Sequence, residues 1–430
     1  MSSFEVQVQA RDVTEDYLAS HSSASPLEGG LSTGVGFFDH MLDQLQSHGL
    51  LTLSVLVSPV PPNPHTVDAS NRNAGRQSEL AQEIGRRLGL ALRPIVAERR
   101  GGRKEGATFM CPLDEALAWC RIEESDDPKA TVELSNPSGG LGKFSATSVG
   151  QLRYSTIVSF FSSLSPSLGL SIHLRNVKGS NSHHVVESAF KAFARCLRLF
   201  MDGRPEGGRH WGSPTEAKGV AKADRKTKET MISVEMSSGG GKKRDSLGNS
   251  KDAGSAAVDV STGIPAFDGL LRALFGGAGV GLVLRCKGDL WIDDHHLVED
   301  VGISLGKCLL TLLGDKKGLN RMWLHEGSMA TAVVDLSNRP HCEAEVGWRT
   351  EGTALREGSV LSKEMVEHFL ESFATESRIT LHVTAEGEGS DDTERATAVM
   401  EAVGKAVGGA MAKDQRREGK VASSKGTLDK

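Results

Sequence analysis

Apolar residues recur at helical spacing in two distant segments of the chain. In FFDHMLDQL (37–45) they stand at positions i, i+1, i+4, i+5 and i+8, and MVEHFLESF (365–373) repeats this order. In both segments a histidine directly precedes the second apolar pair. Because the period is that of an amphipathic α-helix, both segments are predicted to be helices.

Two further segments combine helical periodicity with paired histidines. They are SHHVVESAFKAFARCL (182–197) and DDHHLVEDVGISLGKCLL (293–310), and each follows a strand-like segment. The pattern therefore predicts four equivalent quarters, each of which could in principle supply one lone histidine and one HHxxE sequence.

The chain also repeats itself over longer stretches. LSTGVGFFDHMLDQL (31–45) recurs as VSTGIPAFDGLLRAL (260–274), and VELSN (132–136) recurs as VDLSN (334–338). LGLSIHL (168–174) likewise matches SRITLHV (377–383). A repeat of this length indicates two copies of one folding unit.

We place copy 1 at residues 1–203 and copy 2 at residues 225–430. The segment between them, 204–224, is rich in Gly, Pro and charge and is predicted to be a linker. Residues 237–257 form a second Gly/Ser-rich stretch, predicted to be a flexible insert in copy 2. Its KKR cluster is more typical of a solvated loop than of a recognition patch.

Strand pairs that alternate with amphipathic helices predict an α+β fold. Each copy is expected to be an internal duplication of a two-layer unit, with helices on one face of a mixed sheet.

Composition excludes several classes of protein. A hydrophobic content of 38% and a charged content of 24% are those of a water-soluble globular protein. The net charge of −5 gives no reason to expect a nucleic-acid partner, and no apolar run is long enough to span a membrane. The six cysteines form no CxxC pair, which favours a reducing compartment and argues against a cysteine-bound zinc. The expected location is cytoplasmic, or plastidic if a presequence is missing from this sequence.

The HHxxE sequences are candidates for metal binding. A histidine and a glutamate four residues apart share one helix face, whereas the adjacent histidine points about 100° away. Two such helices with an extra histidine each would suit a pair of ions, and the ligands fit Mn, Fe, Zn or Ni. A single HH pair is usually surface chemistry, but its recurrence at the head of two equivalent helices favours metal binding.

These motifs resemble the imidazoleglycerol-phosphate dehydratase family, which forms imidazoleacetol phosphate in histidine biosynthesis. The resemblance covers nearly all of both copies. In copy 1 it is carried by GVGFFDHMLDQLQSHG, PLDEAL and NSHHVVESAFKAFAR, and in copy 2 by RKTKET, IDDHHLVEDVGISLG, GDKKGLNR, DLSNRP, MVEHF and SSKG. It implies a ribosomal protein S5 domain 2-like fold and ligands shared between neighbouring subunits. The family's ordinary subunit is about half as long as this chain.

The ligands that the resemblance implies are divided between the copies. Copy 1 keeps His40, His183, His184 and Glu187, and copy 2 keeps His295, His296, Glu299 and His368. At the remaining positions our alignment places Ala74, Gly75, Ser78 and Ser159 in copy 1, and Gly269, Asp391, Asp392 and Arg395 in copy 2. The two copies together hold one complete set, so the expectation is one composite site per chain and one decayed site.

The substrate-binding residues that the resemblance implies are also divided. They are Gln44, His48, Asp114 and Lys191 in copy 1, and Arg321, Arg339, Ser423, Ser424 and Lys425 in copy 2. The arginines and the lysine of copy 2 would bind the phosphate through charge-assisted hydrogen bonds. Proton transfer is expected from Glu229 first and Glu15 second, with Glu187 or Glu299 assisting.

The resemblance further implies two Mn²⁺ per site and a phosphate-bearing small molecule as substrate. It also implies a homo-oligomer of about twelve chains, which would form a shell of about 24 units. Two alternatives remain from the residues alone. One is a non-catalytic metal-binding or scaffold subunit, and the other is a metallohydrolase that uses the same ion pair.

Overall fold

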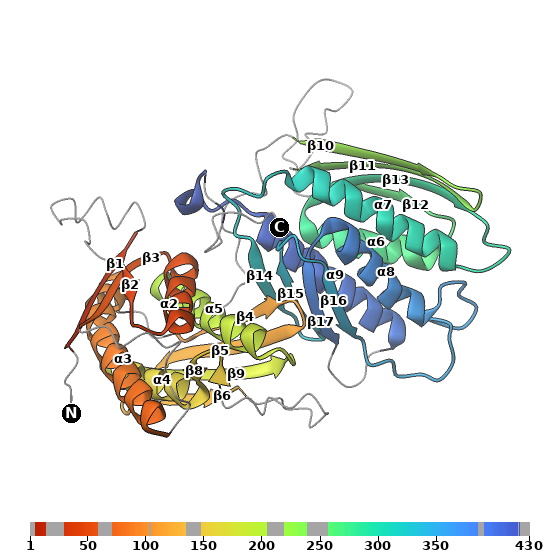
Figure 1. The fold of residues 1–430 in the computed structure, drawn as a ribbon. Coiled ribbons are helices and arrows are strands. Elements are labelled where there is room, and N and C mark those ends of the chain that lie inside the picture. Colours follow the sequence, from red (N-terminus) through yellow and green to blue (C-terminus); the bar gives the residue numbers. More distant parts are fainter. Residues whose placement is uncertain are drawn as a thin grey trace. The chain divides into compact units, whose positions relative to one another are not determined.

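The computed structural model describes residues 5–13, 30–58, 71–102, 105–134, 148–203, 219–238, 257–385, 391–419 and 421. Near residue 207 the chain divides into two compact units, which are described separately (Figure 1). Most of the predicted linker and most of the predicted insert lie outside the described residues.

Unit 1 contains a three-stranded sheet in the order β1-β3-β2, a four-stranded sheet in the order β4-β5-β9-β6, and the two-stranded pair β7-β8. Each of its four described helices comes after a strand in the sequence. The elements are β1 (Glu5–Asp12), β2 (Leu31–Ser32), α2 (Gly36–Gly49), β3 (Leu51–Ser58), α3 (Asn71–Arg100), β4 (Ala107–Leu113), β5 (Ala116–Glu124), β6 (Ala130–Glu133), β7 (Ser148–Val149), β8 (Leu152–Arg153), α4 (Tyr154–Leu168), β9 (Leu170–Lys178) and α5 (Ser182–Met201).

Unit 2 contains two four-stranded sheets, in the orders β10-β11-β13-β12 and β14-β15-β17-β16. The elements are β10 (Val220–Lys226), β11 (Thr230–Ser238), β12 (Val258–Ser261), α6 (Pro265–Ala278), β13 (Val280–Gly288), α7 (His295–Leu313), β14 (Met322–Glu326), β15 (Ala330–Asp335), β16 (His341–Glu345), α8 (Lys363–Ser377), β17 (Thr380–Ala385), α9 (Asp392–Met411) and a 3-10 turn (Gln415–Arg417).

Each complete half follows one connection order. Two strands pair antiparallel, a third strand leads into a helix, and the fourth strand returns parallel to the third before a second helix begins. The turn from helix to returning strand relies on a left-handed residue, such as Gly169 after α4 and Arg378 after α8. The predicted α+β class and the predicted internal duplication are both present in this arrangement.

Helices of the two halves pack against one another inside each unit. In unit 2, α6 contacts α9 and α7 contacts α8, and both sheets line one core (Figure 1). Leu282 of β13, Phe369 of α8 and Leu381 of β17 all belong to that core. The first residues of α5 and α7, which carry the paired histidines, therefore emerge from rigid, buried helices. None of the described helices has the length and apolar character needed to cross a membrane.

Candidate metal centre

In unit 1, the helices α2 and α5 bring His40, His183 and Glu187 together. The Nε2 atoms of His183 and His40 lie 2.9 Å and 3.6 Å from Glu187 Oε2. One potential ligand atom from each residue lies within 4.8 Å of the other two. The N-cap residue Asn181 fixes the helix start, because its side chain accepts hydrogen bonds from the amides of His183 and His184.

The carboxylate of Glu187 is held in its ionised form by its neighbours. Burial alone would raise the pKa of Glu187, but His40 and the buried Lys191 together hold this pKa well below its ordinary value. Lys191 Nζ lies 2.6 Å from Glu187 Oε1. Gln44 lies 3.4 Å from Nδ1 of His40, so the predicted residues Gln44 and Lys191 both border this cluster.

In unit 2, α7 and α8 form the matching cluster. Nε2 of His295 and Nε2 of His368 lie 3.7 Å and 3.6 Å from the oxygens of Glu299. All three ligand atoms again lie within 4.8 Å of one another. The buried Nε2 atom of His368 makes no hydrogen bond to any described residue, which leaves it suited to coordinate an ion.

The spacings in these clusters fit a transition metal. Separations of 3.6–3.7 Å are longer than hydrogen bonds between nitrogen and oxygen. Tetrahedral ligands at about 2.0–2.2 Å from an ion lie about 3.3–3.6 Å from one another. A small contraction around an ion would therefore complete the cluster of unit 2, whereas in unit 1 His183 and Glu187, 2.9 Å apart, would have to separate slightly.

The second histidine of each pair points away from its own cluster. The rings of His183 and His184 are inclined at 86°, and so are those of His295 and His296. Nδ1 of His184 lies 2.8 Å from Glu115, and Nδ1 of His296 lies 3.1 Å from Asp289. A carboxylate at Nδ1 fixes the tautomer and leaves Nε2 available as a ligand.

These carboxylate contacts shift two pKa values in the directions that ion pairing requires. Asp289 raises the pKa of His296. Burial by itself would raise the pKa of Glu115, but the hydrogen bond with His184 lowers it below the ordinary value. Sequence reasoning missed Glu115 and Asp289, because only the folded turns bring them to the histidines.

Two residues that were predicted for substrate binding and proton transfer lie near Nε2 of the outward-pointing histidines. Asp114 lies 3.8 Å from Nε2 of His184, at a turn where its φ of 50° is left-handed. Glu229, in the turn between β10 and β11, lies 4.0 Å from Nε2 of His296. Glu15, the second predicted proton carrier, lies outside the described residues.

The structure corrects the alignment of the decayed positions on α3. A Cβ on Gly85 or Gly89 would meet α4 at Phe160 and Leu164, just as one on Gly302 or Gly306 would meet α8 at Phe369 and Phe373. This shared packing makes Ser78, Glu79 and Gln82 the equivalents of His295, His296 and Glu299. The predicted Ala74 and Gly75 lie one helical turn too early.

Ser159 does occupy the position of His368, and with Glu79 and Gln82 it lines a cavity of about 450 Å³.

The alignment on α9 was also wrong, by two residues. Asp391 is the N-cap of α9 and accepts a hydrogen bond from Glu394 N, as Asn181 caps α5. The positions of the missing histidines and glutamate are therefore Thr393, Glu394 and Thr397, rather than Asp391, Asp392 and Arg395. The alignment failed because no identical residues remain at the start of this helix.

Asp392 has a structural role instead. Its carboxylate lies 2.8 Å from Lys363 Nζ and accepts hydrogen bonds from Arg349 N and Thr350. Burial alone would raise the pKa of Asp392, but these bonds hold the pKa far below its ordinary value. An internal ion pair thus anchors the loop before α8 to the start of α9.

The remaining predicted substrate residues have different environments. Arg321 is buried and makes a bidentate ion pair with Asp335. The backbone oxygen of Arg339 accepts hydrogen bonds from Ser337 and Thr380. His48 is fully buried in α2. Ser423, Ser424 and Lys425 lie outside the described residues.

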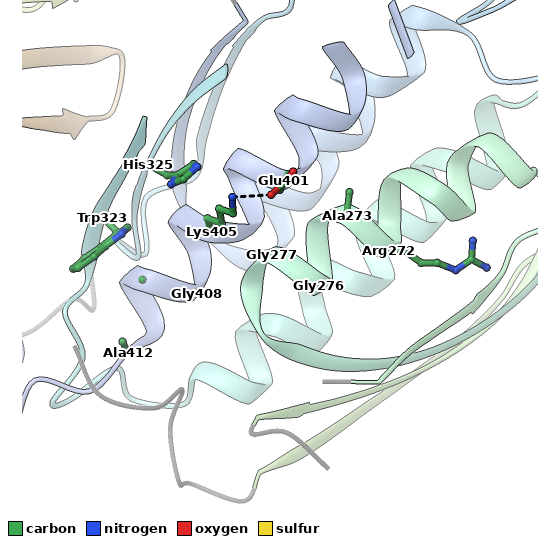
Figure 2. A pocket seen from close by; sticks show the side chains of 11 residues that line it. Arg272, Ala273, Gly276, Gly277, Trp323, His325, Glu401, Lys405, Gly408 and Ala412 are labelled. Atoms are coloured by element: carbon green, nitrogen blue, oxygen red, sulfur yellow. Dashed lines mark ion pairs between the residues drawn. The ribbon is translucent and has the colours of Figure 1, made fainter. Parts of the chain in front are cut away.

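A cavity of about 490 Å³ lies elsewhere in unit 2, beside α6, α9 and β14 (Figure 2). Gly277 allows α6 to approach α9, because a Cβ there would lie 2.9 Å from the backbone oxygen of Glu401. Within the cavity, Lys405 pairs with Glu401. None of the candidate metal ligands lines it, so the metal clusters and this cavity are separate features.

Comparison with known proteins finds one family over both units. The sequence model of the family named imidazoleglycerol-phosphate dehydratase matches residues 33–197 and 262–407. Relatives of that name are 41% identical over 183 residues in Pyricularia oryzae, 39% over 218 residues in Candida glabrata and 38% over 228 residues in Saccharomyces cerevisiae. These matches cover 42%, 49% and 50% of this chain and 79%, 100% and 99% of the relatives.

Two solved structures of the same description also match. The structure from Staphylococcus aureus has a TM-score of 0.36 and 22% identity, and it covers 46% of this chain and 100% of its own. The structure from Pyrococcus furiosus has a TM-score of 0.37 and 25% identity, and it covers 48% of this chain and 99% of its own. Because the family model matches segments in both units and the relatives are covered almost completely, the chain belongs to the imidazoleglycerol-phosphate dehydratase family.

Proposed function

We propose that this protein is an imidazoleglycerol-phosphate dehydratase, a hydro-lyase of histidine biosynthesis, whose complete metal site takes ligands from both copies. The observation that carries this proposal is the complementary division of the ligands. In unit 1, a three-residue cluster and one outward-pointing histidine lie on α2 and α5. In unit 2, the same combination lies on α7 and α8, the helices equivalent to α3 and α4 of unit 1. The equivalent positions of each unit hold residues such as Gly269, Ser78 and Thr393, which cannot replace an imidazole.

Each cluster needs a ligand from the other copy. We assign His296 to the ion held by His40, His183 and Glu187, and His184 to the ion held by His295, Glu299 and His368. Each outward-pointing histidine directs its Nδ1 at a carboxylate outside its own cluster, Glu115 for His184 and Asp289 for His296, and is therefore assigned to the other ion. With this exchange, each ion would have three imidazoles and one carboxylate.

The ions are proposed to be Mn²⁺, one at each cluster. Mixed imidazole and carboxylate ligands accept several divalent transition metals, and the family resemblance favours manganese. When bound, such a pair supplies Lewis-acid stabilisation and a template for the substrate.

Side chains of this chain would move the protons. Glu229 is half-exposed and close to His296, so it can reach a substrate proton and remains the first candidate for proton transfer. Glu187 is a poor candidate, because its low pKa and its pairing with Lys191 make it a weak base. Asp114 has the corresponding place beside His184. Arg339 and Lys425 are proposed to bind the substrate phosphate, together with Ser423 and Ser424.

The shared ligands also support a homo-oligomer. Where the copies of one chain do not complete one another, neighbouring chains must do so, and we propose a symmetric assembly of about twelve chains. All six cysteines are unpaired, which fits a reducing compartment such as the cytoplasm.

The deciding experiment is an activity assay on the purified, Mn²⁺-loaded chain. Formation of imidazoleacetol phosphate from imidazoleglycerol phosphate is expected, and the His183→Ala chain serves as the inactive control. The scaffold alternative predicts no product under conditions in which a single-copy relative turns over. The complete ligand set favours the enzyme, since a scaffold gains nothing from all eight ligands.

A further inference from the structure

A third group of potential ligands lies on the sheet formed by β14 to β17 of unit 2, and it shares no residue with the two helical clusters. His341 and Glu343 stand two residues apart on the edge strand β16, so both side chains project from the same face. Glu343 is in register with His382 on the neighbouring parallel strand β17. One ligand atom from each of the three residues lies within 4.8 Å of the other two.

The distances are those of ligands rather than of hydrogen bonds. Glu343 Oε2 lies 3.5 Å from His382 Nδ1 and 4.0 Å from His341 Nε2. In the helical cluster of unit 2, the corresponding separations between Glu299 and its histidines are 3.6 Å and 3.7 Å. A tetrahedral ion is expected to hold its ligands about 3.3–3.6 Å apart, so all but the 4.0 Å separation already lie within about 0.1 Å of that range.

The environment of the group favours a cation. The side chain of His382 is only 1% exposed, whereas those of His341 and Glu343 are 30% and 35% exposed. The buried Nε2 of His341 makes no hydrogen bond to any described residue. The two imidazole rings lie 5.3 Å apart and are inclined at 34°, close to the 5.0 Å and 32° between His295 and His368 in the helical cluster of unit 2.

Unit 1 provides a natural comparison. His173 on β9 is the equivalent of His382, and it pairs in register with Thr131 of β6 where unit 2 has Glu343. Two residues before Thr131 stands Lys129, at the position of His341. A lysine and a threonine cannot reproduce the triad, so this feature belongs to copy 2 alone.

We propose that His341, Glu343 and His382 bind one divalent transition-metal ion of the Zn²⁺ type, in addition to the ions of the dehydratase site. Two imidazoles and one carboxylate match the borderline-soft character of such an ion, and solvent would complete its coordination. Because His341 and Glu343 lie on the edge strand and His382 lies on its neighbour, the ion would fasten β16 to the sheet.

The test separates this site from the catalytic one. The full chain is prepared with His40, His183, His295 and His368 all changed to alanine, stripped with a chelator and dialysed against Zn²⁺. Metal analysis is expected to find one ion per chain more in this background than after the further change His341→Ala. If both proteins bind the same amount of Zn²⁺, the proposal is wrong, whatever the outcome for the dehydratase site.

A second measurement guards against misfolding. In the wild-type chain, Glu343→Gln keeps the side-chain shape and is expected to remove one bound Co²⁺ and its visible absorption band, while dehydratase activity stays within twofold. The matched change Thr131→Val in unit 1 is expected to alter neither reading. A Glu343→Gln chain that folds normally and retains the full Co²⁺ signal would overturn the assignment.

Discussion

Nε2 of His368 lies 3.6 Å from Oε1 of Glu299, although the two residues belong to different halves of unit 2. Their helices meet closely because a glycine on α7 faces α8 at each contact. A Cβ at Gly306 would lie only 2.7 Å from the backbone oxygen of Phe373. The ligand pair therefore depends on backbone packing about two turns away from the ligands.

The first prediction concerns this packing. Gly306→Ala is expected to push α7 away from α8, to cost about 1–3 kcal/mol of stability and to weaken metal binding at His295, Glu299 and His368. Metal titration and thermal unfolding measure both effects. Gly276→Ala is the control, because nothing lies within 4 Å of a Cβ there. Equal metal affinity in both variants would contradict this account.

The second prediction concerns ligands in different copies. His183→Ala and His295→Ala are each expected to lower dehydratase activity by at least about 100-fold, since either change removes a ligand of the proposed ion pair. Steady-state kinetics on the Mn²⁺-loaded proteins measures the loss. Substantial activity in either variant would show that one copy suffices.

Mixing these two inactive proteins gives separate information. If sites form between chains, mixed assemblies contain some sites with both histidines, and part of the activity returns. If each site forms within one chain, no activity returns. Refolding the two proteins together, with each refolded alone as the control, distinguishes the two arrangements.

The third prediction concerns the carboxylates behind the outward-pointing histidines. Glu115→Gln and Asp289→Asn are expected to weaken metal binding by about 10–100-fold, because the imidazoles lose the partners that orient them. Metal affinity is measured by competition with a chelator. Glu123→Gln on β5 is the control, since Glu123 pairs with Arg121 and His173 instead. Unchanged affinity in the first two variants would show that these carboxylates do not support the site.

The fourth prediction concerns the decayed positions. Gln82→Ala and Thr397→Ala are expected to leave turnover within about twofold of wild type, because neither residue belongs to the proposed site. Glu299→Ala, at the position equivalent to Gln82, is the matched variant and is expected to be inactive. A large loss in Gln82→Ala without unfolding would mean that the second site still works.

The fifth prediction concerns the buried ion pair between Asp392 and Lys363. Asp392→Asn leaves a buried ammonium without its counter-charge and is expected to cost about 3 kcal/mol in the free energy of unfolding at neutral pH. Because folding lowers the pKa of Asp392, its contribution is complete above the ordinary aspartate pKa and is lost as the pH falls below it. Urea unfolding at pH 7 and pH 3 should therefore show a smaller difference from wild type at pH 3. A constant difference would contradict the assigned pKa shift.

The fold class and the internal repeat can be predicted from the sequence, because every quarter contains apolar residues that recur about every 3.6 residues, the period of an amphipathic helix. His40 and Glu187 could be paired in advance only through resemblance, but the HHxxE spacing already places His183 and Glu187 on one helix face. Such local geometry is determined by the helix itself. It needs no knowledge of tertiary contacts.

Other features depend on contacts that no local pattern encodes. The register of α3 was misjudged because Ser78 and Gln82 share no chemistry with the ligands they replace, and only the contacts of Gly85 and Gly89 define it. Asp289 reaches His296 through a turn of six intervening residues. The triad on β16 and β17 could have been suspected from the alternation of His341 and Glu343, but His382 joins it only through the strand register.

The most direct test of the account is anomalous diffraction at the manganese edge from crystals of the Mn²⁺-loaded protein. We predict that the ion beside His295, Glu299 and His368 is also bound by His184 from a first-copy unit, and that the ion beside His40, His183 and Glu187 is bound by His296. Ions coordinated only by residues of a single copy, with His184 and His296 remote from both, would contradict the shared site.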